Sequence, residues 1–319
     1  MALGEFELIE RFFTRPTRRA VLGAGDDCAV LAPAPGMQLC VSSDMLVEGR
    51  HFLGTVAPQR LGHKALAVNL SDLAACGAEP MGFVLALALP RADAAFLAGF
   101  ADGLYRLAEH HAIELVGGDT TAGPLNICIT VFGQVPAGTA LLRSGARAGD
   151  ELWVSGSLGD ARAALEVFRG TLAADAAAFD HWRRAMEMPE PRVALGQRLR
   201  GIASSAIDIS DGLLGDLGHL LRRSGVGARL DADALPASAA LAALPPALRR
   251  ELQLHGGDDY ELLFSAAPAQ RGAVLAAASD AGVAVSCIGR IEPGAALTVT
   301  DGAGQPLAVR RGGFDHFKT

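Results

Sequence analysis

The chain has 319 residues, half of them hydrophobic, and a formal net charge of −7. This length suits two domains, because domains run to roughly 100 to 200 residues. The negative charge argues against a nucleic-acid partner, since such binding depends on Lys and Arg that neutralise phosphates. The apolar runs are far shorter than the roughly 20 residues that span a bilayer, and the five cysteines form no CxxC pair. We therefore expect a soluble cytoplasmic protein with reduced thiols and no structural zinc site.

The sequence lacks the common motifs of nucleotide binding and nucleophilic catalysis. No GxxxxGK[ST] segment occurs, and Lys64 and Lys318 are the only lysines, which excludes a P-loop. GAGDDC, at residues 23–28, does not complete a GxGxxG fingerprint. No GxSxG elbow or local Cys/His signature is present either. Any phosphate chemistry must therefore be organised in another way.

The first part of the chain alternates β-rich runs with helical patterns. Strands are predicted at residues 37–46, 83–90, 113–119 and 125–135. A helix is predicted over 63–80, with an apolar stripe of Leu66, Leu70 and Leu73, and with Gly77 and Pro80 as its stop signals. Its opposite face carries Asn69, Asp72 and Cys76. A second helix is predicted over 93–111.

A segment rich in Pro, Gly, Ala and Arg, residues 136–150, predicts a domain boundary. Beyond it, strands are predicted at 151–156, 204–210, 228–233, 260–266, 285–291 and 297–301. Helices are predicted near 159–169, 172–187, 192–200, 212–224 and 268–281. Because strands and helices do not alternate regularly, we expect an α/β protein of the α+β type, with two domains (1–137 and 148–319) that each hold a mixed β-sheet and flanking helices.

Acidic residues recur where apolar runs end, beside Gly, Ser or Thr. They occur in GDD, SSD, GGD, DISD and GGDD, at Asp26, Asp27, Asp44, Asp119, Asp208, Asp211, Asp258 and Asp259. Taken singly, each is explained as an ordinary turn or helix cap. Asp211 would then cap the helix that follows it, and Asp72 would lie on a solvated helix face.

Taken together, these acids favour a metal site. The paired glycines of GGDTT and GGDDYEL allow a close approach of the backbone to a ligand. SSD and DIS place oxygen-bearing side chains two residues apart, on one face of a strand. Such hard oxygen ligands suit Mg²⁺, and several Mg²⁺ ions would turn an acidic cleft into a polyphosphate site. The eight histidines form no HExxH pair, but His51 follows the SSD strand and is a candidate substrate contact.

Several longer segments share a pattern with a known family. GDDCAV, SSDMLVEGRHF, KALAVNLSDLAACGAEP, GGDTT, RSGARAGD, IDISDGLLGDLGHL and GGDDYELLF follow one another along the chain. Together they closely resemble the thiamine-monophosphate kinase family, from GEFELI near the N-terminus to GGFDHF near the C-terminus. The resemblance implies an aminoimidazole ribonucleotide synthetase-like architecture. It also implies an N-terminal domain that binds ATP and Mg²⁺ and pairs in a homodimer, and a C-terminal domain that completes the nucleotide and substrate site.

The resemblance also implies roles for individual residues. The positions that match metal ligands, for several Mg²⁺ ions, are Asp27, Ser42, Ser43, Asp44, Asp72, Asp119, Asp208 and Asp211. Those that match ATP contacts are Gly118, Asp119, Arg143 and Ser210, and those that match substrate contacts are His51, Asp258 and Phe314. Two positions depart from the family pattern: Asp258 stands where the family often has Glu, and Ser43 where it often has Thr.

The implied reaction transfers a phosphoryl group from ATP to thiamine monophosphate, giving thiamine diphosphate. A phosphate acceptor is largely dianionic at neutral pH, because its second pKa is about 6. We therefore expect direct in-line transfer, with no general base and no covalent nucleophile on the protein. Two alternatives remain at the level of sequence: the ATP-driven cyclisation or activation reactions of the sister families, and a nucleotide-sensing dimer without turnover.

Overall fold

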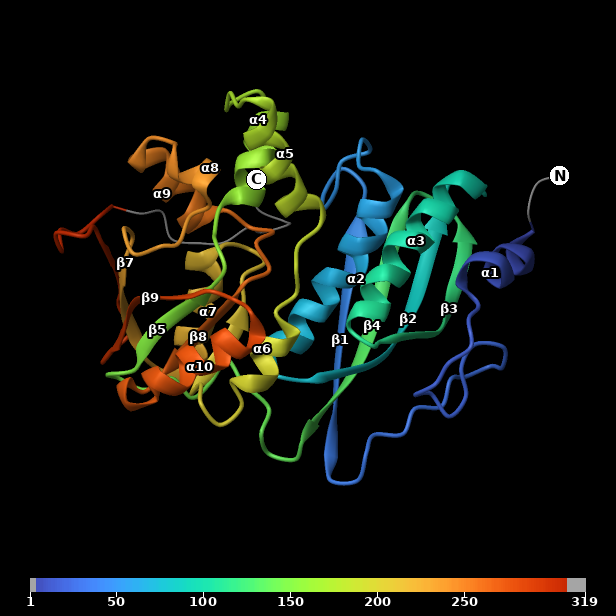
Figure 1. Ribbon diagram of the computed structural model, residues 1–319, viewed down its shortest axis with the longest axis horizontal. Helices are drawn as coiled ribbons and strands as arrows, with labels where there is room; N and C mark the ends of the chain where they lie inside the picture. The colour runs from blue at the N-terminus through green and yellow to red at the C-terminus, as the bar shows by residue number, and fades with distance from the viewer. Residues whose placement is uncertain (1–3, 309–319) are drawn as a thin grey trace. The chain divides into compact units, whose positions relative to one another are not determined.

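In the computed structural model, which describes residues 4–308, the chain forms two compact units. The first unit contains the chain up to Leu73 together with Ala78–Gly138, and the second contains Ala74–Gly77 and the chain from Thr139 onward. Each unit holds one β-sheet with helices packed against it, which confirms the predicted fold class (Figure 1). Among the described residues, no helix is long and apolar enough to cross a bilayer.

The first unit is built on a four-stranded sheet with the order β1-β4-β2-β3. Its β2–β3 pair is parallel and the other two pairs are antiparallel. All four strands were predicted, whereas α1 was not. The elements are α1 (Glu5–Phe13), β1 (Met37–Val47), α2 (Pro58–Ala75), β2 (Glu79–Leu89), α3 (Ala94–His110), β3 (Glu114–Ala122) and β4 (Asn126–Pro136).

Helices α2 and α3 lie over the same face of this sheet (Figure 1). They cross closely because glycines stand at the contact: a Cβ on Gly103 would lie 1.8 Å from the carbonyl oxygen of Gln59. The predicted leucine stripe of α2 is buried. Asn69, on the opposite side of α2, is also buried, with 1% of its surface exposed. Asp72, three residues further on, is half-buried, so this face of α2 is only partly solvated, contrary to the simplest interpretation of its sequence.

The other face of the sheet presents apolar side chains to solvent. On β1, the exposed fractions of Leu39, Val41 and Met45 are 49%, 55% and 53%. Phe132 of the neighbouring strand β4 is half-buried. A row of exposed aliphatic side chains on a sheet face is typical of a surface that a partner covers.

The second unit is built on a six-stranded sheet with the order β10-β7-β9-β5-β8-β6. Only the β10–β7 pair is parallel. The predicted strands and helices are present, whereas the helices α8 and α9 were not predicted. The elements are β5 (Glu151–Ser155), α4 (Asp160–Phe168), α5 (Ala176–Glu187), α6 (Val193–Arg198), β6 (Ser205–Asp208), α7 (Leu213–Ser224), β7 (Gly227–Asp231), α8 (Ala239–Ala242), α9 (Pro246–His255), β8 (Leu262–Ala266), the 3₁₀-helix η1 (Pro268–Gln270), α10 (Arg271–Ala281), β9 (Val285–Glu292) and β10 (Leu297–Thr300).

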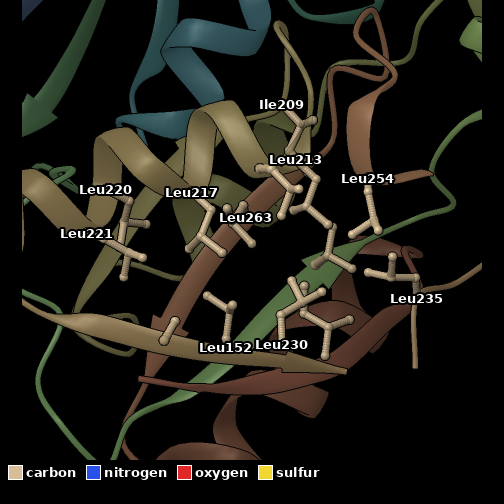
Figure 2. Packing of buried hydrophobic residues seen from close by; sticks show 14 of the residues in the cluster. Leu152, Ile209, Leu213, Leu217, Leu220, Leu221, Leu230, Leu235, Leu254 and Leu263 are labelled. Carbon is tan, nitrogen blue, oxygen red and sulfur yellow. The ribbon is translucent and has the colours of Figure 1, made fainter. Parts of the chain in front are cut away.

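Helix α7 is anchored to this sheet by leucines (Figure 2). Leu213, Leu217 and Leu220 are fully buried and belong to one cluster with Leu152 of β5 and Leu263 of β8. Burial of each such side chain contributes roughly 1.5 to 3 kcal/mol. The short turn between β6 and α7 is therefore held at both ends by rigid elements.

The segment predicted as a boundary is ordered against the second unit. The backbone N–H of Ala206 in β6 donates to the carbonyl oxygen of Leu142 at 2.9 Å. Gly145 packs so closely that a Cβ there would lie 2.3 Å from the carbonyl oxygen of Ser204. Ala146 belongs to the same core as α7. Arg143 is therefore carried on a segment fixed beside β6.

Candidate active site

In the first unit, β1 and α2 bring together three of the predicted metal ligands. The hydroxyl of Ser42 donates to Oδ2 of Asp72 at 2.5 Å. Ser42 and Asp44 are two residues apart on β1 and are both half-buried, so their side chains lie on one face. The structure thus groups Ser42 with Asp72 and places Asp44 on the same side of the strand.

Asn69 fixes β1 to α2 at this point and was not among the predicted site residues. Its Oδ1 accepts the backbone N–H of Asp44 at 3.0 Å, and its Nδ2 donates to the carbonyl oxygen of Ala65 at 3.0 Å. Asn69 lies on the polar face of the predicted helix, three residues before Asp72. That spacing was the signal that could have identified it as a residue facing β1.

Ser43 lies on the other face of β1. Its hydroxyl is 2.9 Å from Oγ1 of Thr130 and donates to the carbonyl oxygen of Ile129 at 3.2 Å. The structure therefore does not bring the Ser43 hydroxyl to Asp72. Alternation along a strand accounts for this result, because neighbouring residues point to opposite faces.

Asp27 and His51 lie in loops that flank β1. Asp27 is exposed, within a loop closed by backbone hydrogen bonds between Leu22 and Val30. The ring of His51 is oriented by the backbone N–H of Val47, which donates to its Nδ1 at 3.0 Å. A neutral His51 therefore carries its proton on Nε2, where it can donate to an anionic ligand.

Asp119 lies exposed on β3, at the sheet edge opposite β1. Two strands separate β3 from β1, which places their backbones about 14 Å apart at the usual spacing of paired strands. Since Mg²⁺ holds its ligands at about 2.1 Å, Asp119 and Asp44 of one sheet do not share a single ion. Asp119 thus has a position separate from the group on β1 and α2.

The glycine before Asp119 is required by the fold. Gly118 has a φ of +150°, and a Cβ there would lie 1.9 Å from the carbonyl oxygen of Leu85 on β2. The predicted close approach of the backbone at this glycine pair is thus made, at Gly118, to the neighbouring strand β2, and its approach to a ligand stays a prediction. The ladder between β2 and β3 leaves no room for a side chain.

We expect Gly118→Ala to destabilise the first unit by about 1 to 3 kcal/mol, because the alanine would be both strained and in collision with β2. Gly117→Ala is the matched control, since its Cβ would make only an ordinary 3.7 Å contact with Val84, and its effect should stay within about 0.5 kcal/mol. Differential scanning calorimetry measures both. Equal melting temperatures for the two variants would contradict the steric account.

In the second unit, the turn between β6 and α7 carries two predicted metal ligands, Asp208 and Asp211, and the predicted ATP contact Ser210. Asp208 ends β6 and is buried, while Ser210 and Asp211 are half-buried. The prediction that Asp211 caps α7 is wrong: the N-cap is Gly212, with a φ of +109°, and no side chain caps the helix there. Asp216, in the first turn of α7, accepts the backbone N–H groups of Ser210 and Asp211 instead, each at 3.1 Å.

Burial and neighbouring charges shift the pKa values of two side chains of α7, Asp216 and His219. Burial and, to a smaller extent, the charge of Asp211 raise the pKa of Asp216 to about 7, although the two backbone hydrogen bonds and Arg143 act in the opposite direction. Burial, Arg222 and Arg143 all lower the pKa of His219. The charge of Arg143 therefore acts on Asp216 and His219 of α7, the helix that follows the predicted nucleotide contact Ser210.

The GGDDYEL segment is tied to the same turn. The backbone N–H of Asp258 donates to the carbonyl oxygen of Ser210 at 2.9 Å, and that of Tyr260 donates to Ile209 at 2.8 Å. Asp258 has a φ of +68°, and the Tyr260 hydroxyl donates to its Oδ1 at 3.2 Å. Here too a glycine, Gly257, serves backbone packing, since its Cβ would lie 2.5 Å from the Ser210 carbonyl oxygen. The structure thus brings Asp258 to Ser210, whereas Phe314 lies outside the described residues.

Asp259, the next residue, is half-buried. Burial raises its pKa well above the usual range, and the charges of Asp160, Glu261 and Asp258 add to this effect. Both of its carboxylate oxygens accept the backbone N–H of Gly159, at 3.0 and 3.1 Å, which opposes the shift. Asp259 therefore anchors the loop to the start of α4 and holds its proton longer in the folded state than in the unfolded chain.

This shift predicts how stability depends on pH. An acid with a raised pKa in the folded state loses its stabilising contribution as pH rises from its ordinary pKa, 3.8 here, towards the folded value. Relative to Asp259→Asn, which keeps an acceptor for Gly159, the wild type should lose stability as pH rises, by at most about 1.4 kcal/mol per pH unit. Urea unfolding can be followed by fluorescence, because both tryptophans, Trp153 and Trp182, are buried in the second unit. A stability gap that stays constant between pH 5 and 8 would contradict this.

Among residues 4–308, no three His, Cys, Asp or Glu side chains gather tightly enough to hold a metal ion by themselves. The observed oxygen donors still fit Mg²⁺. Mg²⁺ is usually bound by one or two carboxylates, with waters and substrate phosphates as the other ligands. Asp72 with Ser42, and Asp44 beside them, form such a partial set of hard ligands.

Comparisons with known proteins identify the family of the chain. Residues 25–135 match the N-terminal domain of AIR synthase related proteins, and residues 147–302 match their C-terminal domain. The thiamine-monophosphate kinase of Escherichia coli K12 is 45% identical over 324 residues, which cover 100% of both chains.

Two solved structures are similar over most of their length. The thiamine-monophosphate kinase of Stenotrophomonas maltophilia has a TM-score of 0.87 and 45% identity, covering 96% of this chain and 99% of that one. AaThiL complexed with AMPPCP and TMP has a TM-score of 0.78 and 30% identity, covering 90% and 89%. The chain therefore belongs to the thiamine-monophosphate kinase family, within the AIR synthase related proteins.

Proposed function

We propose that this chain transfers the γ-phosphoryl group of ATP to thiamine monophosphate, giving ADP and thiamine diphosphate. The observation that carries the proposal is the solved relative that holds an ATP analogue together with TMP and aligns with 90% of this chain. The full-length identity to the Escherichia coli enzyme supports the same reaction. The sister-family reactions have weaker support, because solved structures of the hydrogenase maturation protein HypE share the fold at only 19% to 22% identity.

For this phosphoryl transfer, the protein needs mainly to position the two substrates and to neutralise their negative charge. An oxygen of the acceptor monophosphate forms the new bond to the γ-phosphorus, while the bond from that phosphorus to the β–γ bridging oxygen breaks and ADP leaves. Because the acceptor is largely dianionic above its second pKa of about 6, it needs no general base. The main obstacle is the repulsion between two polyanions, which positively charged groups must offset.

Mg²⁺ is part of this proposal. When bound, it would neutralise charge on the phosphates and on the transferred group. Asp44 and Asp72 are our principal ligands in the first unit, and Asp119 and Asp211 are proposed to fix metal-bound ATP. The other proposed ligands are Asp27, Ser42 and Asp208, while the placement of the Ser43 hydroxyl beside Thr130 gives it no support as a ligand on the Asp72 side.

The remaining predicted residues are proposed to contact the two substrates. Gly118, Arg143 and Ser210 are assigned to the nucleotide, with Arg143 supplying a positive charge that already lowers the pKa of Asp216 in α7. His51 is assigned to the acceptor, because the bond from Val47 fixes its ring and makes Nε2 the protonated nitrogen of a neutral imidazole. Asp258 is assigned to the thiamine portion, together with Phe314. A cytoplasmic location belongs to the same proposal, and five free thiols are consistent with it.

The experiment that tests the function measures ADP release in a coupled assay with ATP and Mg²⁺. Release should depend on added thiamine monophosphate. ADP release that is unchanged when the acceptor is omitted would instead favour an ATPase or one of the sister-family activations. Binding of ATP with no release under any condition would favour the nucleotide-sensing alternative.

We also propose a homodimer in which a second copy covers the open face of the four-stranded sheet. The exposed side chains of Leu39, Val41 and Met45 support this interface, because solvated aliphatic rows of this kind are costly in a monomer. We expect light scattering to give twice the 32.9 kDa chain mass, and Val41→Glu to shift the protein towards the monomer. Leu275→Glu, at a position 49% exposed on α10 of the second unit, is the matched control and should stay dimeric. A monomeric wild type would rule out this interface.

A further inference from the structure

We propose that Asp216 is a positioning residue: its carboxylate holds the turn between β6 and α7 in the shape that binds metal-bound ATP. The inference rests on the proposed function, since it takes Asp208, Ser210 and Asp211 as ligands of metal and nucleotide. Asp216 has no proposed contact with either substrate. It would act through the backbone of residues that have one.

The geometry of the carboxylate is unusual for a helix N-terminus. One oxygen, Oδ2, accepts the N–H groups of two consecutive residues, Ser210 and Asp211, at 3.1 Å each. The side chain reaches back from inside the helix, past the N-cap Gly212, which has no side chain to offer. Asp216 therefore fixes the chain just before the helix, at Ser210 and Asp211, while no side chain caps the N-terminus of α7.

Asp216 is also rigidly placed. Its exposed fraction is only 4%, and the leucines on either side of it, Leu213 and Leu217, are fully buried in the core (Figure 2). A side chain whose supporting residues are locked by packing can hold a neighbouring group to a fraction of an ångström. Because α7 is held rigidly by the core, its Asp216 carboxylate holds the backbone of the turn in one position.

The same turn holds the predicted substrate segment. Ser210 uses its N–H to reach Asp216 and its carbonyl oxygen to accept the N–H of Asp258 at 2.9 Å. The adjacent residue, Ile209, bonds to Glu261 through its N–H and to Tyr260 through its carbonyl oxygen, at 2.9 and 2.8 Å. The buried carboxylate of Asp216 is thus hydrogen-bonded to the β6–α7 turn, and that turn is hydrogen-bonded to the GGDDYEL segment. Each of the two segments is proposed to bind a substrate.

Loss of the Asp216 oxygen leaves two backbone N–H groups without their acceptor, in a partly buried turn. We expect Asp216→Ala to speed amide hydrogen exchange in the peptide 206–212 and to weaken binding of Mg²⁺-ATP, measured by calorimetry, by about 10- to 100-fold, the usual effect of losing a supporting residue around a metal site. Asp216→Asn keeps an oxygen that can accept both N–H groups, so its affinity should stay within about threefold of the wild type. Asp216→Glu keeps the charge but moves the oxygen by a methylene, and should weaken binding as the alanine does, which preserves the test if the alanine variant does not fold.

Asp150 supplies the matched control, because it is buried to a similar extent, 5% exposed, and accepts the N–H of Arg147 at 2.9 Å in the same unit. Asp150→Ala should lower stability without changing the affinity for Mg²⁺-ATP. Equal affinities for Asp216→Ala and Asp150→Ala, or equal losses for Asp216→Asn and Asp216→Glu, would overturn the proposal. Hydrogen exchange and Mg²⁺-ATP affinity can be measured without turnover. A wild type that binds Mg²⁺-ATP but makes no thiamine diphosphate would refute the proposed function. The affinities of the variants would still decide whether Asp216 has a positioning role.

Discussion

Asp72→Asn should lower the rate of thiamine diphosphate formation by at least about a hundredfold at saturating Mg²⁺. Residues that merely support metal ligands already cost about 10- to 100-fold when they are lost, and Asp72 is proposed to be a ligand itself. The asparagine keeps the size of the side chain and an acceptor for the hydroxyl of Ser42, which lies 2.5 Å from Asp72. It removes the negative charge that a divalent cation needs. Steady-state kinetics over a range of Mg²⁺ concentrations measures the effect.

Asp102→Asn is the control for this prediction. Asp102 lies on α3 of the same unit, where it forms an exposed ion pair with Arg106 at 3.0 Å, and such pairs contribute only about 0.3 to 0.5 kcal/mol. The control should keep wild-type kinetics, and both variants should keep the wild-type melting temperature to within a few degrees. Wild-type turnover by Asp72→Asn would remove the metal assignment at the junction of β1 and α2.

Glu261→Ala should destabilise the second unit by about 3 kcal/mol, the largest effect on stability that we expect from one side chain. Arg192 binds Glu261 through two hydrogen bonds, at 2.7 and 2.6 Å, and the hydroxyl of Ser155 donates to the same carboxylate at 2.5 Å. The exposed fractions of the Arg192 and Glu261 side chains are only 17% and 7%. Removing one partner of a buried pair costs about 3 to 5 kcal/mol, because the other charge is left behind. We expect the lower end, since Glu190 remains 3.5 Å from Arg192.

A double variant distinguishes two contributions to this loss: the attraction between Arg192 and Glu261, and the cost of leaving the Arg192 charge without its partner. Arg192→Met combined with Glu261→Leu removes both charges, so it should be more stable than Glu261→Ala alone. Asp280→Ala breaks an exposed pair with Arg198, whose side chains are 64% and 47% exposed, and should cost less than about 1 kcal/mol. Urea unfolding followed by tryptophan fluorescence compares the three. A double variant that is less stable than Glu261→Ala would show that the ion pair itself, and not the unpaired charge, dominates.

The parts of the fold with strong local patterns could be predicted from sequence. The strands β1 to β4, the leucine stripe of α2 and the helix α7 all follow from hydrophobic periodicity, which reports burial of one face. The helix α9 was missed although its Pro245-Pro246 start is a common helix signal. Its weakly apolar pattern could be mistaken for a loop.

The predictions that failed concern which group a polar residue faces. Asp211 looked like a helix cap, but the N-cap of α7 is Gly212, and Asp216 accepts the N–H groups of Ser210 and Asp211 before the helix begins. Asn69 was placed on a polar helix face, but tertiary packing buries it against β1. At Gly118 and Gly257 the structure shows a second reason for glycine, because the backbone of a neighbouring segment occupies the space that a Cβ would fill. The position of Ser43 could have been predicted from sequence, because strand alternation places its side chain on the opposite face from Ser42 and Asp44.

The most direct test of the proposed function is ³¹P nuclear magnetic resonance of the protein with ATP, Mg²⁺ and thiamine monophosphate. The proposed reaction predicts that ADP and thiamine diphosphate appear in equal amounts as ATP and thiamine monophosphate disappear, with no accompanying release of inorganic phosphate. Consumption of ATP with inorganic phosphate as its product, and with the thiamine monophosphate resonance unchanged, would contradict it.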